Sequence, residues 1–188
     1  FPLIEKVAKT KIPILLSTGA SNINEISNAV KLIEKFHNKI CIMHCTLTYP
    51  TPDSDANLGA IQDLQNRFKN FYIGFSDHTL GIEIPASSVA LGVRIIEKHF
   101  TYNKKLKKSA DHWLSISPGE LKKLRYSVDR VMNALGSGKK KVLKSEIKTR
   151  KFARRSLVVN RNLKKGHIIT KNDIIPKRPG TGIPPTKY

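Results

Sequence analysis

The sequence of 188 residues predicts an α/β chain, the C-terminal half of a TIM (β/α)₈ barrel followed by the start of a small β-rich module. Three observations lead to this prediction. Apolar strand-like runs alternate with helix-like stretches, and the runs end near Ser17, Cys45, Ser76 and Glu97. The spacing of these ends is that of βα units with parallel strands. After Gly136 the chain becomes basic and then forms short β-like runs.

An open doubly wound sheet would alternate strands and helices in the same way. Such a sheet normally carries a glycine-rich phosphate loop after its first strand, and no Gly-x-Gly-x-x-Gly pattern occurs here. We therefore favour the barrel. Four units make half of it, and the chain begins with Phe1 rather than Met, so we expect the other half to precede Phe1.

The first part of the chain predicts two helices and two strands. Residues 2–10 are typical of the last turns of a helix, and residues 13–17 of a short apolar strand. Polar N-cap candidates at residues 21–25 precede apolar side chains that recur at helical spacing up to Phe36. A second strand over residues 39–45 then leads into a proline-containing loop.

The next part predicts two further strands, each followed by a helix. The expected elements are a helix over 56–68, a strand over 71–75, a short helix over 84–91, a strand over 93–97 and a longer helix over 118–135. The last helix has Pro118 near its start and Gly136 just past its end, which are the preferred positions of these residues.

Beyond residue 136 we expect two further segments. Residues 137–152 form a basic linker, and residues 153–188 form the small β-rich module. In that module the sequence predicts a strand over 155–159, a turn, and a second strand over 167–170. The predicted domains are therefore residues 1–136 and 153–188.

Composition excludes several classes of protein. No apolar run approaches the ~18 residues of a membrane span, and no signal peptide opens the chain. The two cysteines, Cys41 and Cys45, lie four residues apart on one predicted strand, which is too far for a disulfide. A disulfide scaffold is thereby excluded, and we expect a reducing, cytoplasmic location.

The net charge of +20 is unevenly distributed. Residues 1–100 contain 10 Lys and Arg against 9 Asp and Glu, whereas residues 101–188 contain 24 against 5. A basic half is typical of proteins that bind nucleic acid. Aromatic residues do not alternate with the basic ones as a stacking surface requires, so we favour a solvated basic surface over a nucleic-acid partner.

Two histidines follow consecutive predicted strands. Because side chains alternate along a strand, Ser76 and His78 share one face, as do Glu97 and His99. In a barrel these strand ends form the functional rim. Two imidazoles beside carboxylates are able to hold a divalent metal, but polar residues that simply end strands would give the same spacing. The residues alone leave both interpretations open.

Eight motifs in order then indicate a family. They are Leu16-Ser-Thr-Gly19, His44-Cys-Thr-Leu-Thr-Tyr-Pro-Thr-Pro52, Asn57-Leu58, Gly74-Phe-Ser-Asp-His-Thr-Leu-Gly81, Glu97-Lys-His-Phe-Thr101, Asp111-His112, Arg154-Arg-Ser156 and Lys177-Arg-Pro-Gly-Thr-Gly182. With these motifs, almost the whole chain resembles the sialic acid synthase family.

The resemblance implies a TIM barrel followed by a SAF (antifreeze-like) domain, in a domain-swapped homodimer. It implies an enzyme that condenses phosphoenolpyruvate (PEP) with an N-acylated hexosamine such as N-acetylmannosamine and releases phosphate. The implied cofactor is a divalent metal, usually Mn²⁺, with Mg²⁺ or Co²⁺ as alternatives. Further active-site residues would precede Phe1, so we expect the fragment alone to be inactive.

The resemblance also implies roles for individual residues. His78 and His99 match the metal ligands. Asp111 matches an acidic residue that faces the metal and the sugar, and Tyr49 matches a residue beside the substrates, so these two are the catalytic candidates.

Three further positions would contact substrates. Ser17 and Ser76 match hydroxyls that hold the phosphate and carboxylate of PEP, and Arg178 matches a SAF-domain arginine that contacts the sugar in the partner's site. One position departs from the family. Leu47 stands where members often have an amide or serine that binds PEP, and leucine cannot donate a hydrogen bond.

Two alternatives remain beside this interpretation. One is a sister synthase for legionaminic or pseudaminic acid. The other belongs to a different class, a basic nucleic-acid-binding module that has lost catalysis; the presence of both histidines and Asp111 argues against it.

Overall fold

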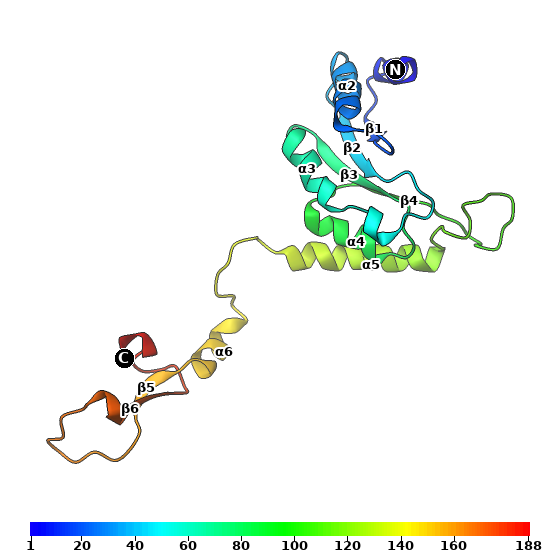
Figure 1. Ribbon diagram of the computed structural model, residues 1–188. Helices are drawn as coiled ribbons and strands as arrows, with labels where there is room; N and C mark the ends of the chain where they lie inside the picture. The colour runs from blue at the N-terminus through cyan, green and yellow to red at the C-terminus, as the bar shows by residue number, and fades with distance from the viewer. The chain divides into compact units, whose positions relative to one another are not determined.

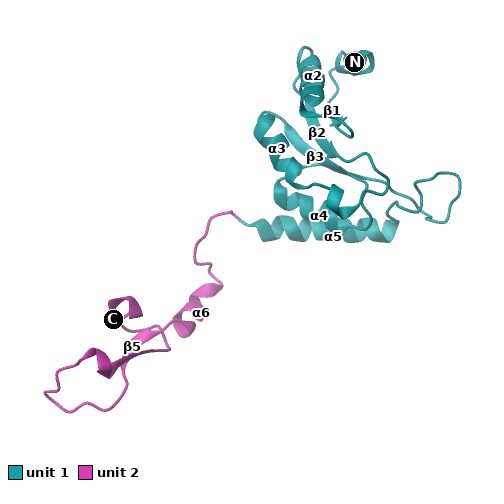
Figure 2. Cartoon of the chain, in the orientation of Figure 1, with its two compact units in different colours: residues 1–136 teal, residues 137–188 magenta.

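The computed structural model describes all 188 residues, which form two compact units, residues 1–136 and 137–188 (Figures 1 and 2). The first unit contains helices α1 (Pro2–Ala8), α2 (Ile23–Glu34), α3 (Gly59–Arg67), α4 (Glu83–Ser88) and α5 (Pro118–Leu135), and strands β1 (Ile14–Ser17), β2 (Ile40–Cys45), β3 (Tyr72–Asp77) and β4 (Ile96–Lys98). None of its helices, and none in the second unit, is both long and apolar enough to cross a membrane.

The four strands form one parallel sheet in the order β1-β2-β3-β4. Each new strand is therefore added at the same edge of the sheet, after a crossover segment. A doubly wound sheet would instead reverse its strand order at a switch point. The predicted α/β half barrel is confirmed.

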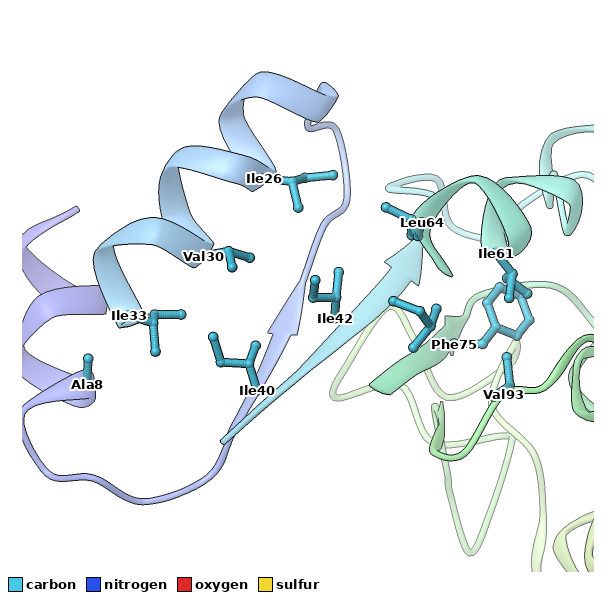
Figure 3. Packing of buried hydrophobic residues seen from close by; sticks show 11 residues of the cluster. Ala8, Ile26, Val30, Ile33, Ile40, Ile42, Ile61, Leu64, Phe75 and Val93 are labelled. Atoms are coloured by element: carbon cyan, nitrogen blue, oxygen red, sulfur yellow. The ribbon is translucent and has the colours of Figure 1, made fainter. Parts of the chain in front are cut away.

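An apolar core joins this sheet to its helices (Figure 3). Helix α2 begins at the capping box of Asn22 and Glu25, and its buried face carries Ile26, Val30 and Ile33. Figure 3 shows these side chains on the side of α2 that faces the sheet, where Ile40 and Ile42 of β2 lie. The apolar core thus covers one face of the sheet, whereas polar side chains such as Ser17 and Asp77 lie at the strand ends.

Two strands of the first unit differ from their predicted bounds by more than one residue. Strand β3 extends to Asp77 rather than ending at Phe75, so Ser76 is part of the strand. Strand β4 begins at Ile96 rather than at Val93. Val93 is buried in the core, which explains its apolar character, but it lies outside the paired strand.

Helix α5 has the predicted bounds because both ends carry strong local signals. Ser117 and Glu120 form a capping box at its start, and Gly136 adopts a positive φ of 56° at its end. Lys104 and Ser117 donate hydrogen bonds to Glu120 and lower the pKa of its carboxyl group to about 2.

The second unit contains helix α6 (Glu146–Ala153) and an antiparallel pair of strands, β5 (Ser156–Val159) and β6 (Ile174–Lys177). The prediction of a strand over 167–170 is wrong, since β5 pairs with β6 instead. Ile168 is 84% exposed, so this apolar segment does not pack against the rest of the unit. Helix α6 also occupies part of the stretch expected to be a linker.

Candidate active site

The candidate residues of the first unit gather where the parallel strands end. Ser17 is the last residue of β1, and Ser76 is the penultimate residue of β3. His78 and His99 directly follow β3 and β4. Since all four strands run in the same direction, their carboxyl ends lie along one edge of the sheet, where barrel enzymes place their active sites.

The imidazole of His78 is held in one orientation by the loop that follows β2. Its Nδ1 lies 2.9 Å from the carbonyl oxygen of Thr46, and its own carbonyl oxygen accepts a hydrogen bond from the Thr51 N–H at 2.9 Å. A carbonyl oxygen only accepts, so Nδ1 carries the proton. In the neutral imidazole Nε2 then has the free lone pair, which is the form of histidine that binds a metal.

Tyr49 lies against both histidines. Its ring centroid is 4.1 Å from that of His78 and 5.5 Å from that of His99, and the two imidazoles are 5.2 Å apart at a steep angle. Desolvation raises the pKa of the Tyr49 phenol, and the negative charges of nearby groups raise it further. Tyr49 is therefore a neutral hydrogen-bond donor at physiological pH.

Asp111 approaches the same cluster from the loop between β4 and α5. Its carboxylate Oδ2 is 3.8 Å from Nδ1 of His99, and its side chain is 46% exposed. A 2.9 Å hydrogen bond between Thr101 and His112 ties this loop together, and a parallel bridge joins Phe100 to Ile116. The loop thus holds a carboxylate on the Nδ1 side of His99.

The donors present are suitable for a divalent metal. No group of three or more His, Cys, Asp and Glu side chains converges as a complete ligand set. His78 and His99 nevertheless form a pair, and the Thr46 carbonyl on the far nitrogen of His78 is the support that metal-bound histidines usually have. The residues of this chain therefore fit as part of a metal site.

The hydroxyl candidates lie nearby on the sheet. Ser76 is 2% exposed, and its Oγ donates a 3.0 Å hydrogen bond to Oε1 of Glu97, its neighbour on β4. Ser17 is exposed at the end of β1. Leu47 is 57% exposed and lines a hollow of about 570 Å³ between the ends of β1 and β2, together with Thr18 and Thr46.

Arg178 belongs to the second unit, where it follows β6. Its Nε donates a 3.0 Å hydrogen bond to the carbonyl oxygen of Ala153, and its side chain is exposed. Its expected contact with a sugar in a partner's site stays a prediction.

Sequence reasoning did not foresee one ion pair at this edge. Asp77 and Lys98 each precede one of the two histidines, and their side chains form an ion pair of 2.6 Å. The signal was present, because alternation turns both charges away from the histidines and towards the helices, where an unpaired charge is costly.

The comparisons with known proteins agree with this geometry. Residues 1–140 match the model of the NeuB family, and residues 154–188 match the SAF domain. The chain is 49% identical to an uncharacterised protein of Methanocaldococcus jannaschii, with all of this chain and 55% of that protein aligned. It is 42% identical to the N,N'-diacetyllegionaminic acid synthase of Campylobacter jejuni, over all of this chain and 56% of that enzyme.

A solved structure shows the same fold. The N-acetylneuraminic acid (sialic acid) synthetase of Leptospira borgpetersenii, crystallised with citrate, superposes with a TM-score of 0.73 at 39% identity. The match covers 79% of this chain and 51% of that one. The chain spans about half the length of the curated relatives it matches. It belongs to the NeuB family of sialic acid synthases and carries a SAF domain.

Proposed function

We propose that the full-length protein condenses PEP with an N-acylated hexosamine, such as N-acetylmannosamine, to form a nonulosonic acid of the sialic acid type. One observation carries the proposal. His78, His99 and Tyr49 form a single ring cluster, with Asp111 beside it, at the strand-end edge of a chain that belongs to the NeuB family. The two imidazoles are donors for a metal that polarises the sugar aldehyde, and the phenol and the carboxylate lie where they would contact the reactants.

His78 and His99 would hold the divalent metal, with Mn²⁺ as the first choice and Mg²⁺ or Co²⁺ as alternatives. When bound, the metal supplies Lewis-acid polarisation of the sugar aldehyde. The protein contributes the orientation of the two imidazoles, which the Thr46 carbonyl fixes for His78 and the Asp111 carboxylate favours for His99.

The other residues bind and orient the reactants. The hydroxyls of Ser17 and Ser76 would donate to the phosphate and carboxylate of PEP, and Ser76 would exchange its bond to Glu97 for one to the substrate. Tyr49 would donate from its protonated phenol. C3 of PEP then forms a bond to the aldehyde carbon of the sugar, water adds at C2, and phosphate leaves.

A homodimer would complete the site. In this arrangement the SAF domain of one subunit would bring Arg178 to the acyl-amino group of the sugar in the partner's site. Its side chain is exposed, and its hydrogen bond to Ala153 uses Nε, so the other two guanidinium nitrogens would make such a contact. We propose a cytoplasmic location for this chemistry, consistent with the buried free thiols of Cys41 and Cys45.

The acyl-hexosamine distinguishes a sialic acid synthase from its legionaminic and pseudaminic sisters. The similar identities to the Campylobacter legionaminic acid synthase and the Leptospira sialic acid synthetase favour neither substrate. Parallel assays with N-acetylmannosamine and with 2,4-diacetamido sugars would identify the substrate by which one gives PEP-dependent phosphate release.

The substitution His78→Ala tests the proposal in the full-length protein. With PEP, Mn²⁺ and the preferred sugar, phosphate release should fall about a hundredfold or more, because loss of a ligand should cost at least as much as loss of a residue that supports one. The matched control is His37→Ala, since His37 precedes β2 at the opposite end of the strands. Turnover that is equal in the two variants would refute the metal-binding role.

A further inference from the structure

A buried ion pair joins the ends of β3 and β4. Nζ of Lys98 lies 2.6 Å from Oδ2 of Asp77, and the two side chains are only 5% and 0% exposed. The residues are direct partners in the register of the sheet. Asp77 immediately precedes His78, and Lys98 immediately precedes His99. The pair therefore lies at the base of both histidines.

The same pair also forms hydrogen bonds with the backbone of Thr79, the residue after His78. Oδ1 of Asp77 accepts a 2.9 Å hydrogen bond from the N–H of Thr79, and Nζ of Lys98 donates to the carbonyl oxygen of Thr79. Thr79 is 1% exposed, so these backbone groups have no access to water and need internal partners. The bend that carries His78 is thus closed on one side by Asp77 and on the other by Lys98.

Other ion pairs of the first unit are built differently. Glu5 with Lys9 and Arg125 with Asp129 are exposed pairs within one helix turn, with side-chain exposures between 44% and 72%. Burying two charges carries a large desolvation cost, and well-packed apolar residues often stabilise a core equally well. A buried pair at this one position is therefore explained better by the geometry it imposes than by stability.

We propose that Asp77 and Lys98 are positioning residues that set the separation and orientation of the His78 and His99 imidazoles. Through the register of β3 and β4 the pair couples the two strand ends, and through Thr79 it holds the bend that presents His78. The inference rests on the proposed role of the two histidines in binding the metal.

Binding of Mn²⁺ to the full-length protein, followed by the electron paramagnetic resonance signal of free Mn²⁺, tests the inference without turnover. Lys98→Met should raise the Kd for Mn²⁺ about 10- to 100-fold, as expected for loss of a residue that supports metal ligands. The control Lys9→Met breaks an exposed pair and should leave the Kd unchanged.

The double variant Asp77→Asn/Lys98→Met separates positioning from stability. Removing both charges leaves no buried charge unpaired, so Tm should recover relative to Lys98→Met. The weakened Mn²⁺ binding should persist, because the double variant still lacks the hydrogen bond from Lys98 to Thr79 and the ion pair that joins the ends of β3 and β4. Wild-type affinity in the folded double variant would overturn the inference.

A second variant keeps the test decisive if those proteins fail to fold. Asp77→Glu retains both charges but makes the acidic side chain one methylene longer. The variant should therefore fold, and the changed spacing of the ion pair should still weaken Mn²⁺ binding. Wild-type affinity in Asp77→Glu would also contradict the inference. If His78→Ala and His99→Ala bind Mn²⁺ as the wild type does, the proposed function itself fails, which is a distinguishable result.

Discussion

The two units bury different kinds of side chain. The first unit buries mainly apolar residues, and Ile33, Ile42 and Ile61 are all 0% exposed. In the second unit the buried residues are two polar ones, Ser156 and Asp173. Burial of apolar surface is non-directional, whereas hydrogen bonds to a buried polar atom require defined geometry. The first unit is thus organised by packing and the second by polar contacts.

Each of these two buried polar residues, Ser156 and Asp173, connects separate segments of the second unit. Oγ of Ser156 donates to the carbonyl oxygen of Pro179 and accepts from the N–H of Gly182, both at 2.8 Å. Asp173 accepts hydrogen bonds from Arg161, His167 and Thr170. These donors, His167 first, hold the pKa of the Asp173 carboxyl well below its usual range. A small unit with little apolar burial depends on such contacts.

The largest effect should come from the apolar core. Ile42→Ala should lower the free energy of unfolding of the first unit by about 2–5 kcal/mol, because it leaves a cavity among closely packed residues. Chemical denaturation of the full-length protein measures this change. The control in the second unit, Ile168→Ala, removes a side chain that is 84% exposed and should change stability by less than about 0.5 kcal/mol. Equal losses would show that the comparison is wrong.

A smaller effect should come from the serine of the second unit. Ser156→Ala removes the acceptor of the Gly182 N–H and should destabilise the second unit by about 1–3 kcal/mol. Hydrogen exchange should become faster at the β5 and β6 amides and stay unchanged in the first unit. Ser137→Ala, at an exposed serine of the same unit, is the control. Faster exchange in both units would contradict a role of the Ser156 contacts that is confined to the second unit.

The smallest effect should come from a half-buried carboxylate, that of Glu120, at the start of α5. The Glu120 pKa of about 2 lies below its unfolded value, so the stabilisation is present above about pH 4.5 and is lost as pH falls towards 2. The Tm difference between wild type and Glu120→Gln should therefore disappear near pH 2. A difference that persists or grows in acid would contradict this sign.

The corresponding change in the second unit is Asp173→Asn. At neutral pH it should lower the Tm of its unit more than Glu120→Gln lowers the Tm of the first unit. Asp173 is buried and joins three other residues, whereas Glu120 mainly caps one helix. As pH falls below about 4, protonation of Asp173 in the unfolded chain should reduce the stability of the wild-type unit.

Local signals in the sequence predicted the elements whose ends they define. Helix α5 was predicted over its full length because Pro118 and Gly136 act on their immediate neighbours. The alternation along β3 and β4 correctly placed His78 and His99 near each other, since a strand has a fixed period of two. The family was also recognisable, because its motifs are short and ordered along the chain.

Contacts between distant segments were beyond such signals. The strand expected at 167–170 is absent because β5 selects its partner by register with residues 174–177, which no local pattern specifies. In the same way the stacking of Tyr49 on His78 depends on how the loop after β2 folds back, held by the Thr46 and Thr51 contacts.

The sequence by itself determined the βα order, the helix caps, the family and the face on which each histidine lies, because these follow from local periodicity and short motifs. The tertiary structure alone decided that Asp77 pairs with Lys98 and that both bind Thr79. It also decided that Ser156 and Asp173 organise the second unit. Such contacts depend on the three-dimensional positions of groups far apart in the chain, and these positions arise only when the strands are in register.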